Sequence, residues 1–517
     1  MIRLLLGAGT LLLAVMALAL ASCGGDDGAS APASGKLDLA VDKAAFTITF
    51  PAGDLQGGAP QSIASGDFNH DGKPDLLLGA PYNDGPDGSR TDGGEAYILY
   101  GPIDGDVDLA QHQPDARILG AAAGDMLGAG VAAGDLNGDG IDDIVVGAPG
   151  SNGVPEVRTD MGEAYVVFGG TSIPATIDIA SKGQAFTFQP AEGFSAVGKT
   201  FAIADVNGDG VNDLVIGAPY AGRAEGTPPG SPRTTVGEVY VVYGSHDLGG
   251  VATVVSNQED VRLSGLNTYD QFGDSVAAGD VNGDGIADII AGASGYDGTV
   301  DARPEAGGVF VFYGGPDLPK HKTLAEADLA IAGADKADLF GTIVSAADLN
   351  GDGRAEIVSV APEGAGPNND RFASGEVSFF DPAAYQGPST GQASTDAATR
   401  IFAPTNSELM SGGLAVTAGA SPRIAIGSVM RMTPDRMGAG WTYVVPAPAA
   451  NVDLASSASD VLTIEGAAAS DGLGGALAFA DLDSDDKPEL LVESAGGLQS
   501  SGGDPTFVGR IYVVRVP

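Results

Sequence analysis

The stretch GDLNGDGIDDIVVGAP, residues 134–149, decides the fold of this chain. Its polar side chains alternate with other residues at Asp135, Asn137 and Asp139, and a fourth stands at Asp143. A short β-branched run and Gly-Ala-Pro come next, which is typical of a tight loop that leads into a buried strand. Nearly the same phrase recurs along the chain, with its first acid at Asp67, Asp205, Asp280, Asp348 and Asp481.

The recurrences are regular enough to count the repeats. Successive first acids are 68, 70, 75, 68 and 133 residues apart. Because the last interval is about twice the others, a degenerate copy is expected at LAVTAGASPRIAIGS, residues 414–428. The chain therefore contains seven units of about 70 residues, a period typical of propellers and solenoids.

Each unit has the same internal order of predicted strands. A strand of small residues precedes the acidic loop, and a strand such as LLLGAP or IVVGAP follows it. A third strand alternates aromatic and aliphatic residues, as in EAYILYG, and a more polar fourth strand closes the unit, as in ARILG. This order predicts an all-β protein, a seven-bladed β-propeller of four-stranded blades.

The two ends of the chain are expected to complete one blade together. The last unit stops after its third strand, residues 511–514, and a spare strand, FTITF at residues 46–50, precedes the first unit. Pairing them would remove the exposed sheet edge that an open array carries. Residues 37–517 are therefore interpreted as one propeller domain closed by an N-terminal strand.

The charge balance excludes one broad class of function. Among 517 residues there are 68 Asp and Glu against 25 Lys and Arg, a formal net charge of −43 at pH 7. Nucleic-acid binding requires basic surface, so that class is excluded. The excess acid is either solvating surface or a set of cation ligands counted without their cations.

Residues 1–22 are interpreted as an export signal. They combine a positive charge with an apolar run and end in LASC at residues 20–23, where Cys23 is the chain's one cysteine. The ending resembles the lipobox of bacterial lipoproteins. That resemblance implies lipidation of Cys23, membrane contact through the lipid alone, and a place in the cell envelope, at the outer membrane or cell surface. A plain secretory signal is the alternative, and residues 23–36 are a predicted flexible tether.

The acidic phrase D-x-N-x-D-G-x-x-D has the composition of a calcium loop. Oxygen ligands at positions 1, 3, 5 and 9, with a backbone carbonyl at position 7, suit a hard cation, and glycine at position 6 allows the sharp turn. The phrase lacks the position-12 Glu of an EF-hand and lies between strands, so it is not an EF-hand. The candidate metal ligands are Asp67, Asn69, Asp71, Asp75, Asp135, Asn137, Asp139, Asp143, Asp205, Asn207, Asp209, Asp213, Asp280, Asn282, Asp284, Asp288, Asp348, Asn350, Asp352, Glu356, Asp481, Asp483, Asp485 and Glu489.

These residues predict five to six calcium ions. The sixth repeat has lost every ligand, and the seventh has Asp486 where the turn glycine should be. Extracellular modules bind calcium with Kd values of about 10⁻⁴ to 10⁻³ M. At about 1 mM calcium each site then adds roughly 0.4 to 1.4 kcal/mol to stability. The expected role is bracing rather than catalysis, because a loop that supplies its own ligands leaves little room for a substrate.

The repeat resembles that of a known family. The segment QFGDSVAAGDVNGDGIADIIAGAS, residues 271–294, carries both the FG and the GA elements of the FG-GAP repeats found in integrin α-subunit propellers. The resemblance covers about residues 37–517. It implies a seven-bladed propeller with calcium in the hairpin loops of one face and partner binding on the opposite face. The chain has more calcium loops than integrin propellers typically keep and lacks their leg and membrane context, so integrin ligand specificity is not implied.

A second periodic feature is an arginine five residues before the third strand, which only the seventh repeat lacks. One interpretation is a structural ring in which each arginine pairs with a recurrent acid before the first strand, at Asp54, Asp125, Asp270, Asp338 and Asp471. The other is a ligand-binding surface for anionic groups such as acidic glycans. The candidate residues are Arg90, Arg158, Arg233, Arg303, Arg371 and Arg436.

The sequence predicts a binding module rather than an enzyme. None of the four histidines recurs with the repeat, and the chain has no histidine cluster suited to zinc, so no catalytic residue is assigned. The expected partner is a protein or glycan on the face opposite the calcium loops, for adhesion or scaffolding. A glycan-active propeller enzyme and a structural envelope subunit are the alternatives.

Overall fold

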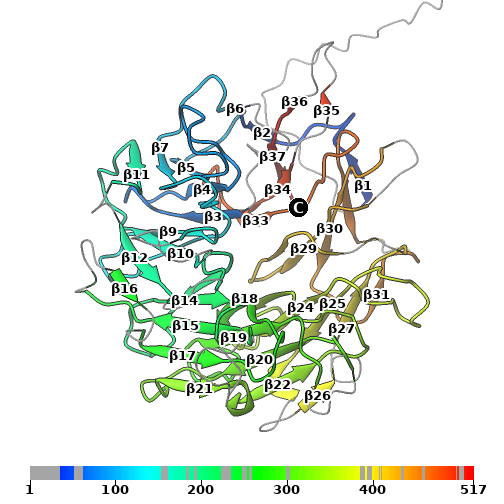
Figure 1. Cartoon of the computed structure of the whole chain (residues 1–517). Coiled ribbons are helices and arrows are strands. Elements are labelled where there is room, and N and C mark those ends of the chain that lie inside the picture. The colour runs from blue at the N-terminus through cyan, green and yellow to red at the C-terminus, as the bar shows by residue number, and fades with distance from the viewer. Residues whose placement is uncertain are drawn as a thin grey trace, which may run out of the picture.

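The computed structural model shows a ring of β-sheets around a central axis (Figure 1). The residues that it describes are 35–51, 62–152, 161–181, 185–190, 195–222, 235–246, 248, 253–255, 259–298, 303–384, 390–392, 399–406, 408, 410–431, 436–456, 460–495, 498–499 and 506–516. Seven of the sheets have five strands each, so the predicted seven-bladed propeller is confirmed.

The blades follow the repeats, and the strands of each blade succeed one another from the axis outward. Blade 1 contains β3 (Ser62–Gly66), β4 (Asp75–Ala80), β5 (Glu95–Leu99), β7 (Ala116–Leu119) and β11 (Thr176–Asp178). Blade 2 contains β8 (Val131–Gly134), β9 (Asp143–Ala148), β10 (Glu163–Val167), β12 (Phe186–Gln189) and β16 (Thr253–Val255). Blade 3 contains β13 (Phe201–Ala204), β14 (Asp213–Ala218), β15 (Glu238–Val242), β17 (Val261–Ser264) and β21 (His321–Thr323).

The other four blades have the same order. Blade 4 contains β18 (Phe272–Gly279), β19 (Asp288–Ala293), β20 (Gly308–Phe312), β22 (Leu329–Ala332) and β26 (Thr390–Gln392). Blade 5 contains β23 (Ile343–Ala347), β24 (Glu356–Ala361), β25 (Glu376–Phe380), β27 (Thr399–Phe402) and β31 (Val452–Asp453). Blade 6 contains β28 (Leu414–Val416), β29 (Arg423–Ser428), β30 (Trp441–Pro446), β32 (Leu462–Glu465) and β1 (Gly35–Asp38). Blade 7 contains β33 (Leu477–Ala480), β34 (Glu489–Ser494), β37 (Arg510–Arg515), β2 (Phe46–Thr49) and β6 (Val107–Asp108).

Few other elements occur in the described part of the chain. A two-stranded hairpin, β35 (Leu498–Gln499) with β36 (Thr506–Phe507), lies between β34 and β37. Two short 3₁₀ helices span Leu324–Glu326 and Pro382–Ala384. Within the described residues, no helix is long and apolar enough to cross a membrane.

The fifth strand of every blade was not predicted. It comes from outside the repeat that forms the blade and runs parallel to the fourth strand, as β11 does beside β7. In blades 1 to 5 that segment is the connection between the third and fourth strands of the following repeat. Without it the fourth strand would be an open edge that invites pairing with other chains. Each blade is therefore covered by its neighbour in sequence.

The N-terminal segment closes the ring as expected. β2 pairs antiparallel with β37, with Phe46 opposite Val513 and Ile48 opposite Ile511, and so supplies the fourth strand of blade 7. Just before it, β1 forms the fifth strand of blade 6. The first two residues of β1 fall within the predicted tether of residues 23–36, so that tether was drawn two residues too long. In Figure 1 these blue strands lie beside the orange and red strands of the C-terminal blades.

The hydrophobic core lies between blades, since each sheet has apolar side chains on both faces. The second strands, such as β9 with DIVVGA, are buried along their whole length and accordingly read as continuous apolar runs. Between blades 1 and 2, for example, Leu77 and Ile98 pack in one cluster with Ile144 and Val146. Blade interfaces packed in this way tie the repeats into one ring.

Two faces result from the antiparallel order of the strands. The hairpin face carries the loops between first and second strands, which include residues 67–74, 135–142, 205–212, 280–287, 348–355, 417–422 and 481–488. The opposite face carries the loops between second and third strands and the connections from one blade to the next. The candidate calcium loops therefore lie on the hairpin face and the arginine-bearing loops on the opposite face.

Candidate metal loops and arginine contacts

The first acid of the loop in blade 2 organises the backbone around it. Oδ1 of Asp135 accepts hydrogen bonds from the backbone N–H of Gly138 (2.6 Å) and Asp139 (3.1 Å), and Oδ2 accepts one from Gly140 (2.8 Å). Oδ1 of Asn137 accepts a further bond from Asp139 at 2.9 Å. The loop therefore curls around its own oxygen atoms, with three ligand-type side chains on one short turn.

The fourth acid ties the loop to the sheet. Asp143 is fully buried, and its Oδ2 accepts the N–H of Leu136 while its Oδ1 accepts the N–H of Gly169, each at 2.9 Å. Burial raises the pKa of Asp143 to about 7, although both hydrogen bonds act against the shift. A carboxylate that is costly to ionise beside two other acids is stabilised by a bound cation.

The loops share a backbone that the sequence showed only in part. Position 6 has positive φ, as expected of a turn glycine, for example 83° at Gly140. Position 4 has positive φ as well, 71° at Gly138. At that position the first loop has His70 and the seventh has Ser484, and the seventh loop also places Asp486 at position 6, all three at positive φ.

Four of the six acidic loops repeat this geometry. In blades 1, 3 and 4 the fourth acid, Asp75, Asp213 or Asp288, is again fully buried and accepts a backbone N–H from position 2. Burial raises their pKa to about 6 for Asp75 and about 7 for Asp213 and Asp288. The side-chain atoms that these loops offer to a metal ion are carboxylate or amide oxygens, which are the ligands that calcium requires.

Blade 5 has a variant loop with an acid that the sequence analysis missed. Asp352, Glu356 and Asp381 each place a carboxylate oxygen within 4.8 Å of the others. Asp381 stands directly after the third strand, where blades 1 to 4 have Tyr100, Phe168, Tyr243 and Tyr313. The replacement of the repeat's Tyr or Phe by Asp in FFDP was the sequence signal that could have found it. The extra acid accompanies the longer Glu356 at position 9.

The seventh loop holds a tight acidic group and competing cations. Oxygen atoms of Asp481, Asp483 and Asp485 lie within 4.8 Å of one another. Oδ1 of Asp483 is buried without a hydrogen-bond partner among the described residues, as expected of an oxygen that awaits a cation, whereas its Oδ2 accepts Nη2 of Arg515 at 2.6 Å. Lys487 lies 3.3 Å from Asp485. This loop fits a cation in its donor set, with two basic side chains at its margin.

The sixth repeat retains the hairpin without ligands. Oγ1 of Thr417 accepts the N–H of Arg423 at 2.8 Å, and the backbone N–H of Thr417 donates to the carbonyl of Arg423. The degenerate copy expected at residues 414–428 is thus β28 and β29 joined by a turn. A blade can therefore form without an acidic loop, so the ligands are not needed to specify the strands.

Neighbouring acidic loops are hydrogen-bonded to one another. The N–H of Asp142 donates to the carbonyl of Asp67 in the previous blade at 3.2 Å, and the N–H of Ala355 donates to the carbonyl of Asp280 at 2.8 Å. Oδ2 of Asp142 also accepts the N–H of Asp67 at 2.9 Å. A cation that orders one loop would therefore also order the contact with the next blade.

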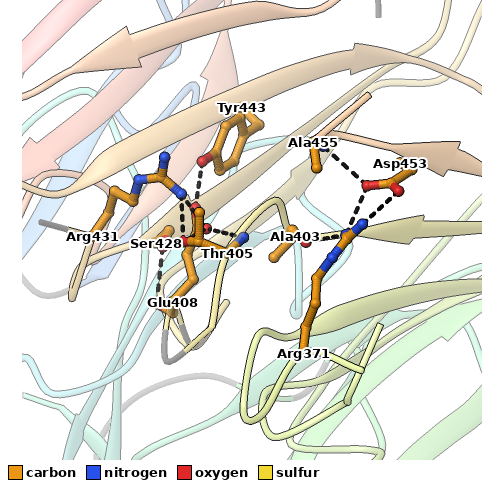
Figure 2. A network of polar contacts seen from close by, with 9 residues as sticks. All are labelled: Arg371, Ala403, Thr405, Glu408, Ser428, Arg431, Tyr443, Asp453 and Ala455. Atoms are coloured by element: carbon orange, nitrogen blue, oxygen red, sulfur yellow. Dashed lines mark hydrogen bonds and ion pairs between the residues drawn. The ribbon is translucent and has the colours of Figure 1, made fainter. Parts of the chain in front are cut away.

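On the opposite face, three of the predicted arginines hold the fifth strands in place. Arg371 forms a bidentate pair with Asp453 of β31 at 2.7 and 2.6 Å and donates to the carbonyl of Ala403 at 2.8 Å (Figure 2). Arg90 pairs in the same way with Asp178 of β11, at 2.8 and 2.8 Å, and Arg436 pairs with Asp38 of β1, at 2.7 and 2.5 Å. We call this contact the arginine clamp.

In the arginine clamp the acid comes from a fifth strand, whereas the predicted arginine ring used the recurrent acid before the first strand. Each guanidinium holds the pKa of its aspartate, Asp38, Asp178 or Asp453, below the usual value. Arg303 occupies the same loop position in blade 4 and donates to the carbonyls of Gly333 (2.6 Å) and Ala334 (3.1 Å). Arg158 and Arg233 lie outside the described residues. Ligand binding by the arginines stays a prediction.

The recurrent acids before the first strands serve local turns, which corrects the pairing expected for them. Oδ2 of Asp125, Asp270, Asp338 and Asp471 each accepts the backbone N–H three residues earlier, at 2.8 to 3.2 Å. All four are buried, and Asp54 lies outside the described residues. The equivalent residue before blade 6 is Glu408, which the sequence analysis did not single out. It accepts hydrogen bonds from Thr405 and Tyr443 and pairs with Arg431 (Figure 2).

The motif that marks the clamp was also overlooked. The clamp aspartates stand in LDLA (37–40), IDIA (177–180) and VDLA (452–455), and VDLA recurs at residues 107–110. In each of the four, the N–H of the alanine donates to the aspartate, as Ala455 does to Asp453 at 3.0 Å. An aliphatic–Asp–aliphatic–Ala phrase before the fourth strand thus marks four of the seven fifth-strand segments, without indicating which blade each one joins.

A buried carboxyl in blade 7 gives a pH-dependent stability. Glu493 is buried near Asp471, and burial raises its pKa to about 8. Because the folded pKa lies above the unfolded value of about 4.3, the stability that the protonated carboxyl contributes is fully present below that value and is lost as pH rises through about 8.

Glu493→Gln is therefore expected to be more stable than the wild type at pH 9, by at least about 1 kcal/mol, and equal to it at pH 4. Urea denaturation of both proteins at pH 4 and pH 9 in saturating calcium tests this. An equal difference at both pH values would contradict it.

Comparison with known proteins places the repeats. Five segments match the family model described as FG-GAP repeat, residues 59–99, 127–167, 197–242, 272–312 and 340–379, which lie in blades 1 to 5. The chain is 33% identical over 207 residues to a phosphatidylinositol-glycan-specific phospholipase D of Mus musculus, which is 39% of this chain and 22% of that protein. It is 30% identical over 250 residues to integrin alpha-5 of Xenopus laevis, 47% of this chain and 20% of that protein. Integrin alpha pat-2 of Caenorhabditis briggsae is 30% identical over 245 residues, 45% of this chain and 18% of that protein. Each match thus spans about a fifth of the relative.

Proposed function

We propose, from the five segments that match the FG-GAP repeat model, that this chain is a calcium-braced binding module held at the cell envelope by a lipid. Calcium ions bound in the hairpin loops stabilise the ring. The opposite face binds a protein or glycan partner. The observation that carries the proposal is the confinement of six oxygen-rich loops to one face, with neighbouring loops hydrogen-bonded together.

The residues that would hold the ions are those at positions 1, 3, 5 and 9 of each loop. In the loop of blade 2 these are Asp135, Asn137, Asp139 and Asp143. Support comes from the donor set, which contains oxygen atoms only, and from the buried Oδ1 of Asp483 in the seventh loop, which has no partner in the described part of the chain. A bound calcium would supply the positive charge that the buried carboxylates need, which is a structural role.

Binding rather than catalysis is proposed for the opposite face. The sequence similarity to the phospholipase D covers 22% of that protein, so the activity in its name is not carried over to this chain. Two of the three relatives compared are integrin α chains. A rigid ring whose variable loops share one face is suited to present a recognition surface.

A retention assay tests the binding function. The full chain is passed over immobilised glycans and extracellular-matrix proteins in about 1 mM calcium or in chelator, and the supernatants are assayed for new sugar ends. We expect calcium-dependent retention without new ends. New sugar ends would overturn the proposal in favour of a glycan-active enzyme. Absence of retention on every surface would instead favour a structural subunit of the envelope.

The lipid anchor is tested separately, since Cys23 lies outside the described residues. In bacterial cells the wild type is expected to incorporate labelled fatty acid and to sediment with membranes. Cys23→Ser is expected to lose the label and to remain in the supernatant. If Cys23→Ser still sediments with membranes, anchoring through this cysteine is wrong, while the binding function remains to be judged by the retention assay.

A further inference from the structure

We propose that Arg303, on the rim of blade 4, is the anchor point for a carboxylate of a partner protein. This inference rests on the proposed function, in which the opposite face binds a partner, and it names the group that is recognised. The three arginine clamps of the same chain show what an arginine in this position binds.

Blades 1, 4, 5 and 6 place their arginines in the same way. Each guanidinium donates through Nη1 to the carbonyl of the residue that follows the fourth strand. That residue is Gly120 for Arg90, Ala403 for Arg371, Gly466 for Arg436 and Gly333 for Arg303. One edge of the guanidinium is fixed by this bond, so little side-chain freedom remains to be lost when a carboxylate binds.

In three of these blades the fifth strand brings the carboxylate. The clamp aspartate stands beside the last residue of the fourth strand, with Asp178 opposite Leu119, Asp453 opposite Phe402 and Asp38 opposite Glu465. In blade 4 the residue in this register is Gln392, opposite Ala332. Within the described part of the chain, Arg303 has no ion pair with a carboxylate. The four blades thus share the bond to the carbonyl that follows the fourth strand. Blade 4 differs in its acid and in a second bond from Nη1 of Arg303, to the carbonyl of Ala334 at 3.1 Å, which a bound carboxylate would replace.

A second observation on blade 4 points to the same surface. Tyr269 is 67% exposed and has φ of 71°, a conformation that costs a bulky residue about 1 kcal/mol or more. The equivalent residues in other blades, Gly124, Ala337 and Ser470, also have positive φ, so the conformation belongs to the turn and the exposed aromatic ring is what distinguishes Tyr269. Its backbone contacts the turn at Gly295, and the same turn joins the Arg303 loop through the N–H of Gly307 and the carbonyl of Tyr296. The N–H of Tyr269 donates to the carbonyl of Thr235, so this residue lies between the loops of blades 3 and 4 and adds an exposed aromatic side chain to the face that carries Arg303.

The chemistry favours a protein carboxylate over a glycan. In this chain the same receptor binds aspartate side chains of extended segments, three times over. Tyrosine and arginine are also the side chains that dominate protein–protein binding energy. A partner that presents an aspartate between aliphatic residues would reproduce the contact seen at Arg371 and Asp453 (Figure 2).

The test uses the full chain labelled with ¹⁵N-arginine, in calcium. The probes are the peptide acetyl-Val-Asp-Leu-Ala-amide, its asparagine analogue, and trigalacturonate. We expect the aspartate peptide to shift the Nε–Hε resonance of Arg303, identified by its loss in Arg303→Gln, and the asparagine analogue to leave it unchanged. In Arg303→Gln the affinity for the peptide should fall about tenfold or more, as judged by the remaining shifts of neighbouring resonances.

A second variant keeps the test independent of any folding defect. Gln392→Asp supplies the missing acid in the sibling register, so it should raise the melting temperature and abolish the peptide titration. The matched control Gln392→Asn should do neither. Arg371→Gln, which breaks a clamp that is filled from within, should lower the melting temperature and leave the Arg303 titration intact.

Three results would overturn the proposal. The first is a peptide titration that persists in Arg303→Gln or in Gln392→Asp. The second is equal binding of the aspartate peptide and its asparagine analogue. The third is a shift of the Nε–Hε resonance of Arg303 by trigalacturonate but not by the peptide, which would make the partner a glycan. If calcium-dependent retention of the full chain persists despite such a result, only the anchor is wrong and the proposed function stands.

Discussion

Removal of calcium is expected to lower the free energy of unfolding of the full chain by about 2–8 kcal/mol at about 1 mM calcium. The range follows from six loops at roughly 0.4 to 1.4 kcal/mol each, with Kd values of about 10⁻³ to 10⁻⁴ M. An unfolding entropy of about 2.1 cal/mol/K per residue gives about 1 kcal/mol/K for a chain of this length, so the melting temperature should fall by about 2–8 °C. Calorimetry in calcium and in chelator measures both quantities.

Two variants show whether the effect belongs to the loops. Asp135→Asn combined with Asp139→Asn should remove about one sixth of the calcium-dependent increment and one bound ion in a titration. Thr417→Ala in the sixth hairpin, which has no acidic ligand, should leave the increment unchanged. If the calcium-loaded and the chelated protein unfold at the same temperature, the bracing role is wrong.

Truncation of one side chain in the closing strand is expected to have the largest effect of any single substitution considered for this chain. Ile48 of β2 is fully buried between blades 7 and 1, in one cluster with Leu78, Leu491 and Ile511. Ile48→Ala should destabilise the protein by about 2–5 kcal/mol through the lost burial and the cavity left behind. Urea denaturation followed by circular dichroism measures this loss.

The neighbouring residue provides the matched control. Thr47 points to the other side of β2, because successive side chains in a strand alternate, and it is only half-buried. Thr47→Ala should change stability by less than about 1 kcal/mol. Hydrogen exchange of β37 should increase in Ile48→Ala and not in Thr47→Ala. Equal losses in the two variants would mean that the closing strand does not pair in this register.

The number of blades and the closure of the ring could be predicted because their causes are local and repeated. The acidic phrase, the aliphatic second strand and the aromatic third strand recur in the same order, and each pattern specifies its own element. The spare strand at residues 46–50 could be assigned to blade 7 because its alternation, Phe46, Ile48 and Phe50, matches a strand with one buried side. The acidic loops were likewise readable, since all but one of their acids come from a single nine-residue phrase. The exception is Asp381, which reaches the fifth loop from another strand.

The sequence by itself determined the repeat, the strand order and the place of the acidic loops, because these depend on residues close together in the chain. Only the tertiary structure decided the fifth strands and the partners of the arginines. Arg436 meets Asp38 across 398 residues, and Arg371 meets Asp453 across 82. Such pairs form because each blade borrows a strand from elsewhere in the chain, and periodicity within one repeat carries no information about that exchange. For the same reason Arg303 could not be distinguished from the other arginines until the register placed Gln392, not an acid, opposite Ala332.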